Sequence, residues 1–387
     1  MDALASTWSR TPAASCLLVS DGNRVLFERN PDRPVLPAST MKLLTATAVL
    51  ARIDPDSRLR TPVLAAAPPE AEGTVQGDLW LSGGGDPLLA TSAYRAHYER
   101  QPRLASSIEA LADRVVAAGV RHVTGRVMGD DGRYDRQRYV PSWNPQYLKD
   151  HETGPLSALY VNDGFERWSP DVPFPDPAAG AAAIFNELLR QRGVRVDGLP
   201  ASGSVPPSSV ELASLASPTI AEIVQEMLRQ SDNSTAELLV RELGVQVLGN
   251  GTTDAGRRVV DDTLRRLGLP MNGVRVVDGS GLDTGNRVTC RLLAAILTST
   301  PLRGIIGEGL PIAAQTGTLY KRFLATPVAG HLRAKTGSIK RVASLAGFAD
   351  NQAGPTLTFA YVQNATTSAQ GTKRQDELGN ELVLAAP

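Results

Sequence analysis

Two side chains suited to nucleophilic catalysis stand three residues apart in the segment Ser39-Thr40-Met41-Lys42. Residues three apart lie on one face of a helix, so the Lys42 amine can reach the Ser39 hydroxyl. A helix start favours an alkoxide, and burial lowers the pKa of a lysine, so Lys42 could accept the serine proton. The spacing is common by chance, and the alternative is a capping serine beside a surface lysine. The stretch after Lys42 is apolar almost all round, as in a buried helix, which favours the catalytic interpretation.

A second polar triplet, Ser231-Asp232-Asn233, falls between two stretches with helical patterning. In a loop at that place, Ser231 could pass a proton to a leaving group, and the Asn233 amide could bind a substrate carbonyl. The alternative is an ordinary capping loop in which Asn233 or Ser234 starts the next helix. Taken alone, the triplet favours the capping loop.

A third candidate, Lys335-Thr336-Gly337, lies on a predicted strand and is followed by Ser338. A glycine inside a strand often marks the close approach of another backbone. A peptide substrate could lie antiparallel to this strand, with Lys335 and Thr336 binding its terminal carboxylate. The backbone N–H groups of Ser338 and Ser39 could then form an oxyanion hole. The similar triplet at 315–317 lacks the lysine, so the later site is preferred.

The elements that must hold these side chains are predicted from hydrophobic periodicity and turn residues. Predicted strands cover 16–19 and 25–28, which form a hairpin, and 79–81, 123–128, 332–336, 342–349 and 356–362. Predicted helices cover 39–53, 108–118, 178–192, 219–229, 236–248 and 374–384. Strands at both chain ends around a helical middle indicate one α/β domain that is interrupted by an insertion.

Proline pairs at 68–69 and 206–207 mark the limits of this insertion. We therefore expect a catalytic domain made of residues 1–67 and 211–387. One accessory domain, residues 68–210, is inserted after the first catalytic helix.

Composition narrows the function further. The 387-residue chain has no formal net charge at pH 7, which argues against binding to nucleic acid or to membrane surfaces in general. No run approaches the about 20 apolar residues of a membrane span, and the first residues show no signal peptide. The four histidines lack metal-ligand spacing, so neither a metal nor a cofactor is expected. Cys16 and Cys290 could form one disulfide or be two buried thiols, and we expect the thiols.

The three motifs follow one another in the order Ser-x-x-Lys, Ser-x-Asn and Lys-Thr-Gly, a set typical of penicillin-binding proteins and class A β-lactamases. The sequence resembles the class C low-molecular-mass penicillin-binding proteins, the D-Ala-D-Ala carboxypeptidase/endopeptidase family. Further segments that resemble family signatures run over nearly the whole chain: Leu81-Ser82-Gly83-Gly84-Gly85-Asp86-Pro87, Gly129-Asp130-Asp131, Tyr134-Asp135, Asp278-Gly279-Ser280-Gly281-Leu282, Asn286-Arg287-Val288-Thr289 and Gly317-Thr318-Leu319. Members usually carry a third domain nested within the second. The stretch 161–177 is too short for one, so we expect that domain to be absent or vestigial.

The resemblance implies the serine transpeptidase/β-lactamase-like α/β fold, in which an antiparallel sheet packs against a helical lobe. It implies that Ser39 attacks the penultimate D-alanine of a peptidoglycan stem peptide, that Lys42 is the general base and that Ser231 protonates the departing amine. β-Lactam antibiotics would acylate the same serine. Such a substrate places the protein in the periplasm or cell wall, with the export signal absent from this sequence.

Two other functions fit parts of the pattern. A β-lactamase or esterase could use the same site, but no motif for a deacylating carboxylate is found. A non-catalytic penicillin-binding sensor would lack one of the three motifs, and none is lost.

Overall fold

The structure is a computed structural model that describes residues 2–168, 171–299, 301–352 and 354–384. The chain folds as two compact units. The first unit comprises residues 1–54, 224–243 and 253–387, and the second comprises residues 55–223 and 244–252. All eight predicted site residues belong to the first unit: Ser39, Lys42, Ser231, Asn233, Lys335, Thr336, Gly337 and Ser338.

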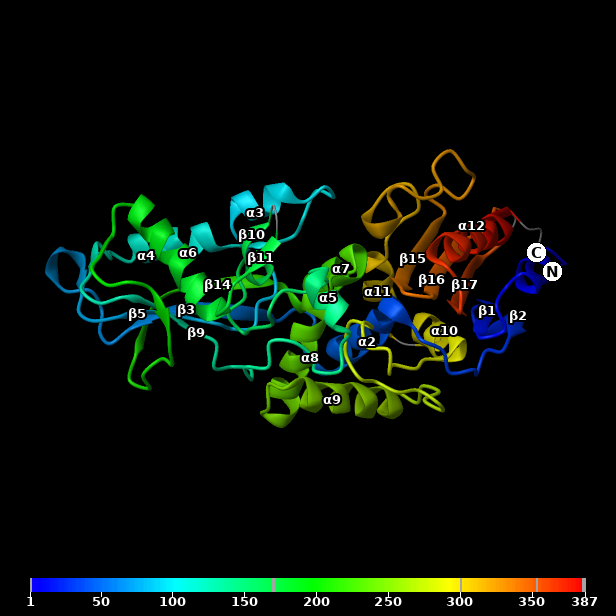
Figure 1. Ribbon diagram of the computed structural model, residues 1–387, viewed down its shortest axis with the longest axis horizontal. Coiled ribbons are helices and arrows are strands. Elements are labelled where there is room, and N and C mark those ends of the chain that lie inside the picture. The colour runs from blue at the N-terminus through cyan, green and yellow to red at the C-terminus, as the bar shows by residue number, and fades with distance from the viewer. Residues whose placement is uncertain (1, 169–170, 300, 353, 385–387) are drawn as a thin grey trace. The chain divides into compact units, whose positions relative to one another are not determined.

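A five-stranded antiparallel sheet in the order β15-β16-β17-β1-β2 forms the centre of the first unit (Figure 1). Its strands are β1 (Ser15–Asp21), β2 (Arg24–Arg29), β15 (Leu332–Ile339), β16 (Val342–Asp350) and β17 (Thr356–Asn364). Because β1 pairs with β17, the two ends of the chain meet in one sheet, and the predicted fold class is confirmed here. Alternate side chains of a strand face opposite sides. Thus Leu17 and Val19 pack in one core with Leu378 and Leu382 of the last helix, whereas Cys16 faces the other side.

The helices of this unit supply the rest of its core. They are α1 (Asp2–Ser9), α2 (Lys42–Arg52), α9 (Thr253–Arg266), α10 (Cys290–Ser299), α11 (Arg303–Gly309) and α12 (Ser368–Leu384), with 3-10 turns η1 (Ala38–Met41) and η4 (Gly317–Leu319). Two more helices, α7 (Ile220–Gln230) and α8 (Asn233–Leu248), have residues in both units. The sequence did not predict α1, α9, α10 and α11. Helix α12 starts earlier than predicted because Thr367 Oγ1 accepts the N–H of Gln370 at 3.3 Å, which caps the helix start.

The second unit contains a mixed sheet in the order β13-β9-β5-β3-β14, with a core shared by α4 and α6. Its strands are β3 (Arg58–Ala65), β4 (Thr74–Val75), β5 (Leu79–Ser82), β6 (Leu89–Ala90), β7 (Ser106–Ser107), β8 (His122–Val123), β9 (Val127–Asp130), β10 (Phe165–Trp168), β11 (Asp171–Pro173), β12 (Arg195–Val196), β13 (Ala201–Ser202) and β14 (Val210–Thr219). Its helices are α3 (Ser92–His97), α4 (Ile108–Ala117), α5 (Pro145–Lys149) and α6 (Pro177–Gln191), with 3-10 turns η2 (Ala71–Gly73) and η3 (Asn162–Gly164).

Two sequence-based boundaries differ from the structure. The single strand predicted at 123–128 is two strands, because β8 pairs with β4 and β12 whereas β9 pairs with β5 and β13. Gly125 lies between them, where a Cβ would come within 2.5 Å of the Gly77 backbone. Strand β3 pairs along its length with β14, and both belong to the second unit rather than to the predicted catalytic segments. The assignment of the insertion as an accessory domain, without a nested third domain, stays a prediction.

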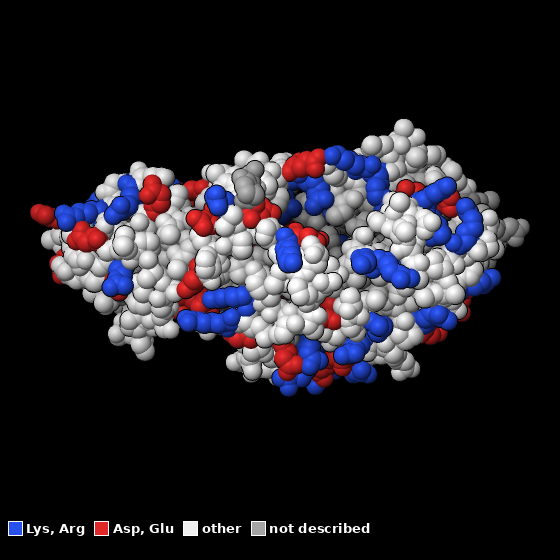
Figure 2. Space-filling model, in the orientation of Figure 1, with Lys and Arg blue, Asp and Glu red and all other residues white. Residues whose placement is uncertain are grey.

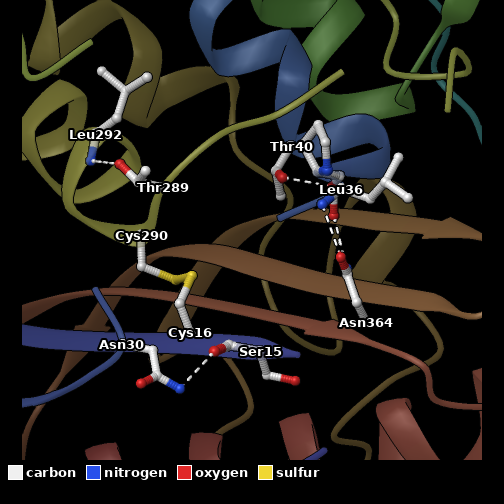
Figure 3. The surroundings of a disulfide bond; sticks show 10 residues. Ser15, Cys16, Asn30, Leu36, Thr40, Thr289, Cys290, Leu292 and Asn364 are labelled. Atoms are coloured by element: carbon white, nitrogen blue, oxygen red, sulfur yellow. Dashed lines mark hydrogen bonds between the residues drawn. A yellow bond between two sulfur atoms is a disulfide. The ribbon is translucent and has the colours of Figure 1, made fainter. Parts of the chain in front are cut away.

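The expectation of two buried thiols was wrong, because Cys16 and Cys290 form a disulfide (Figure 3). Their Cα atoms lie 5.8 Å apart although 274 residues separate them in sequence. Cys16 faces the side of β1 that lies away from the α12 core. Its partner Cys290 is the first residue of α10, which lies on the same side of β1 as the Cys16 side chain. Thr289 Oγ1 accepts the N–H of Leu292 at 3.1 Å and so caps the first turn of α10. A cross-link between such distant segments typically stabilises a fold by about 2–4 kcal/mol.

Charges on the visible face alternate in sign along α9 rather than forming a basic surface (Figure 2). Four arginines of this helix pair with aspartates one turn away: Arg257 and Arg258 with Asp254, Arg265 with Asp261, and Arg266 with Asp262. Exposed pairs of this kind contribute little to stability, but they offset most of the positive charge of the four arginines. Within the described residues, no helix is long and apolar enough to span a membrane, and no group of three or more His, Cys, Asp or Glu could hold a metal ion.

Candidate active site

The segment that leads to Ser39 is hydrogen-bonded to two strands of the central sheet, β16 and β17. Asn364, at the end of β17, receives the N–H of Leu36 at 2.9 Å and donates to the Leu36 carbonyl at 3.1 Å (Figure 3). Ser344 of β16 donates its hydroxyl to the Pro37 carbonyl at 2.6 Å. These bonds hold the backbone of Leu36 and Pro37, and so they fix the position of the turn that carries Ser39.

Ser39 lies in the 3-10 turn η1, and α2 begins at Lys42 rather than at Ser39 as predicted. The predicted proximity of the two side chains holds, because Lys42 Nζ lies 3.2 Å from Ser39 Oγ. Lys42 is fully buried, and its amine also donates to Asn233 Oδ1 at 2.7 Å and to the Ser280 carbonyl at 2.8 Å. A neutral amine that keeps donating to Asn233 and Ser280 turns its lone pair toward Ser39. The geometry therefore suits a general base.

The triplet Ser231-Asp232-Asn233 forms a capping loop, and two of its side chains also contact the site lysines. Asp232 Oδ1 accepts the N–H of Thr235 at 2.7 Å and caps α8, whose first residue is Asn233. Ser231 has a positive φ of 63°, a conformation that costs energy for a residue with a Cβ and is common at functional sites. The capping loop thus turns the Ser231 hydroxyl and the Asn233 amide toward the two lysines.

Lys335 on β15 is the second fully buried lysine of the site. Its amine donates to Ser231 Oγ at 2.7 Å and to the Thr336 carbonyl at 2.8 Å. A positive charge beside the Ser231 hydroxyl favours release of its proton toward a substrate. Lys42 therefore contacts Ser39, and Lys335 contacts Ser231.

The remaining predicted residues lie along the same strand, which is at the edge of the sheet. Ser338 is exposed and lies opposite Ala343 of β16. The Thr336 hydroxyl lies 2.6 Å from the hydroxyl of Thr318, a residue of η4 to which the sequence assigned no role. This contact fixes the orientation of Thr336, the residue expected to bind the carboxylate of a substrate.

Gly337 is needed for the close approach of Ser39 itself. A Cβ at Gly337 would lie 2.2 Å from Ser344 Oγ, 2.9 Å from the Ser39 nitrogen and 3.0 Å from the Pro37 oxygen. Real Cβ atoms do not come so close, so any side chain would push the segment 37–39 away from β15. The sequence predicted that another backbone lies close to this glycine, and we expected that backbone to be the substrate. In the structure, the close backbone is that of residues 37–39, which lead into the turn of Ser39.

We expect Gly337→Ala to slow acylation of Ser39 by about 10²-fold, because small displacements of a reacting atom cost rates of this order. The measurement is the rate at which the benzylpenicillin adduct appears by intact mass. Gly304→Ala on α11 is the matched control, since a Cβ there meets no atom within 4 Å. Acylation of Gly337→Ala at the wild-type rate would show that the contact with Ser39 is unimportant.

The sequence missed the contribution of the loop Asp278-Gly279-Ser280-Gly281-Leu282, which it recognised only as a family signature. Gly281 has a φ of +90°, and its Cα approaches the Ala38 carbonyl so closely that a Cβ would lie 2.0 Å from it. This approach brings the Ser280 carbonyl to Lys42. The two glycines of the loop were the signal, but only the fold shows which backbone they approach.

Comparisons with known proteins show the family to which this chain belongs. The model of the family described as the D-Ala-D-Ala carboxypeptidase 3 (S13) family matches residues 10–172 and 166–382. A D-alanyl-D-alanine carboxypeptidase of Actinomadura sp. (strain R39) is 29% identical over 92% of this chain and 78% of its own length. The carboxypeptidase DacB of Mycolicibacterium smegmatis is 33% identical over 89% of this chain and 75% of its own length.

Among solved structures, penicillin binding protein 4 of Haemophilus influenzae superposes with a TM-score of 0.81 at 20% identity, covering 98% of this chain and 99% of that one. This likeness confirms the predicted fold class. The family match and the carboxypeptidase relatives confirm the predicted enzyme class. The chain therefore belongs to the D-Ala-D-Ala carboxypeptidase 3 (S13) family, as the resemblance to class C low-molecular-mass penicillin-binding proteins implied.

Proposed function

We propose that this protein hydrolyses D-alanyl peptide bonds of peptidoglycan through an acyl-enzyme on Ser39. Lys42 takes the proton of the Ser39 hydroxyl while Ser39 Oγ attacks the carbonyl carbon of the penultimate D-alanine. The backbone N–H groups of Ser39 and Ser338 hold the resulting oxyanion. Asn233 uses its amide N–H to bind a carbonyl of the substrate.

The leaving amine then needs a proton, and Ser231 supplies it. The C–N bond breaks, and the Ser231 hydroxyl is reprotonated through the lysine beside it, Lys335, whose amine is 2.7 Å away. Lys335 and Thr336 bind the terminal carboxylate of the departing D-alanine. Before the second step, Lys42 passes the proton it took from Ser39 to solvent and Lys335 regains a proton from solvent, so Lys42 is neutral again. Lys42 then takes a proton from the water that attacks the acyl carbon and gives it to Ser39 Oγ as the ester bond breaks, which releases the acyl product and restores the serine.

The observation that supports this mechanism most is the environment of Lys42. Its amine is buried and contacts Ser39 Oγ at 3.2 Å, Asn233 Oδ1 at 2.7 Å and the Ser280 carbonyl at 2.8 Å. A lysine with a purely structural role would not need to contact the hydroxyl of Ser39. An amine placed between two strong acceptors and a serine can exchange a proton with that serine.

The same site would be acylated by a β-lactam, so binding of penicillin does not separate a carboxypeptidase from a β-lactamase. The second step separates them, because a bulky penicilloyl group blocks the approach of water whereas a small acyl group with a departed amine does not. We expect slow turnover of penicillin, with a long-lived adduct, and repeated turnover of a peptide that ends in D-Ala-D-Ala.

The test measures both reactions on one preparation. Peptide cleavage is followed by release of free D-alanine, and penicillin hydrolysis by loss of the β-lactam absorbance. A cross-linked muropeptide assayed alongside distinguishes carboxypeptidase from endopeptidase action. Rapid penicillin hydrolysis without peptide cleavage would overturn the assignment in favour of a β-lactamase.

We further propose that the protein works outside the cytoplasm, in the periplasm or cell wall. Its substrate lies there, and the Cys16–Cys290 disulfide suits an oxidising compartment. The natural protein should therefore be recovered from the wall or periplasmic fraction and should react with a thiol reagent only after reduction. Recovery from the cytoplasm with both cysteines reduced would contradict this placement and would favour the esterase alternative.

A further inference from the structure

One buried carboxyl beside the site has no part in the mechanism described so far. Glu237 follows Asn233 by four residues on α8, so it lies on the same face of that helix one turn later. The side chain is fully buried. Burying a carboxyl is expensive unless it is neutralised or satisfied by hydrogen bonds, so its presence needs a physical reason.

Glu237 holds the backbone segment that contacts the general base. Its Oε1 accepts the N–H of Gly279 at 3.0 Å and the N–H of Ser280 at 2.7 Å. The Gly279 carbonyl, in turn, accepts the hydroxyl of Thr45 on α2 at 2.8 Å. With the peptide group between Gly279 and Ser280 held at both ends, the next carbonyl, that of Ser280, is held on Lys42 at 2.8 Å.

Glu237 and the neighbouring Asp278 both accept backbone N–H groups of this loop, but their hydrogen bonds differ. Asp278 accepts the N–H groups of Gly281 at 2.9 Å and Asp283 at 2.6 Å and the side-chain amide of Asn286 at 2.7 Å, which is the environment of an ionised carboxylate. Glu237 has bonds on Oε1 only, and its Oε2 has no hydrogen-bond partner among the described residues. Of the two, Glu237 is the one that suits a protonated state.

Electrostatics point the same way. Burial, and next the charge of Asp278, raise the pKa of Glu237 to about 8, although hydrogen bonds from Ser280 and the charge of Lys42 act in the opposite direction. Arg241 follows Glu237 by four residues on its own helix. A charged Glu237 would stabilise the protonated form of Lys42, which cannot accept the proton of Ser39, whereas a neutral Glu237 leaves Lys42 free to cycle between its two states.

We propose that Glu237 is a positioning residue that holds the Ser280 carbonyl against the general base Lys42, and that it does so as an uncharged carboxylic acid. This inference rests on the proposed function of Lys42. It assigns Glu237 no contact with the substrate. Its predicted effect is on the rate and pH dependence of acylation.

Two substitutions separate the acceptor from the charge. Glu237→Gln keeps a carbonyl oxygen for the two N–H groups and is uncharged at every pH, so we expect acylation by benzylpenicillin within about three-fold of wild type at neutral pH. Glu237→Leu leaves both N–H groups unpaired and releases the Ser280 carbonyl, so we expect a loss of about ten-fold or more. Glu381→Gln on α12, where Glu381 accepts the hydroxyl of Thr7, is the matched control and should not change the rate.

The pH dependence tests the uncharged state. Because the pKa of Glu237 is raised from 4.5 to about 8, the folded protein keeps a proton that the unfolded chain loses over this range. The melting temperature of wild type should therefore fall relative to that of Glu237→Gln as the pH rises from about 5 to 8. The acylation rate of wild type should likewise fall relative to Glu237→Gln above pH 8, as the carboxylate forms.

The outcomes are distinct. Wild-type rates in both Gln and Leu variants would overturn the positioning role. A Gln variant as slow as the Leu variant, with no relative change of melting temperature, would show that Glu237 acts as a charged carboxylate, contrary to the proposal. A folded wild-type protein that penicillin does not label would contradict the proposed function itself and, with it, the base that Glu237 is inferred to position.

Discussion

Replacement of Ser39 by alanine is expected to abolish the covalent adduct with benzylpenicillin and the cleavage of D-Ala-D-Ala peptides. Oγ is the only non-hydrogen atom removed, and it is the atom that Lys42 Nζ contacts at 3.2 Å. Without it no acyl-enzyme can form, so the residual rate is that of the bound substrate with water. The fold should survive, because the bonds of Asn364 and Ser344 to residues 36–37 do not involve the Ser39 side chain.

Intact-mass spectrometry after incubation with benzylpenicillin measures this directly, and peptide mapping of the wild-type adduct locates it. Ser20→Ala, which removes a buried hydroxyl from β1 of the same unit, should be labelled like wild type. An adduct that persists in Ser39→Ala would move the nucleophile elsewhere, with Ser231 and Ser338 the first serines to map.

Replacement of Lys42 by arginine is expected to slow acylation by about 10²–10⁴-fold, the usual contribution of a general base. Arginine keeps the charge and the reach, but its guanidinium cannot give up a proton at neutral pH. The site also excludes the larger group, since Lys42 is fully buried and its amine already lies against Asn233 Oδ1 and the Ser280 carbonyl.

The rate of adduct formation over a range of penicillin concentrations measures this effect, and thermal unfolding verifies the fold. Lys42→Met has a similar length without any charge, and it should lose acylation to the same extent if the missing function is proton transfer. Lys340→Arg, in the exposed turn between β15 and β16, should be unchanged. If Lys42→Arg acylates within a few-fold of wild type, the lysine is structural and another base must be sought.

Features of the site that depend on neighbours in the sequence were predictable. The spacing of Ser39 and Lys42 places them together because a helical turn spans three to four residues. Lys335, Thr336 and Gly337 were predicted on a strand, and β15 carries them. The hairpin of β1 and β2 also follows from local alternation and turn residues, as does the presence of strands at both chain ends.

Contacts between distant segments were not predictable in this way. Asn233 lies 191 residues from Lys42, Ser280 lies 238 residues from it, and Ser231 lies 104 residues from Lys335. The motifs implied that these segments meet, but they did not show that the Ser280 carbonyl would be a partner of Lys42 or that Gly337 would adjoin the Ser39 backbone. The disulfide was judged wrongly for the same reason, since nothing near Cys16 or Cys290 indicates that α10 packs against β1.

The sequence by itself predicted the chemistry, because the residue types, their local spacing and the order of the three motifs indicated a nucleophile, a base, a proton relay and a carboxylate-binding lysine. Only the tertiary structure decided how that chemistry is supported. The loop 278–282, Glu237 on α8 and the pairing of β3 with β14 are set by which surfaces pack together. The packing of these surfaces depends on the free energy of the whole chain, so it cannot be recognised from a sequence pattern within any one segment.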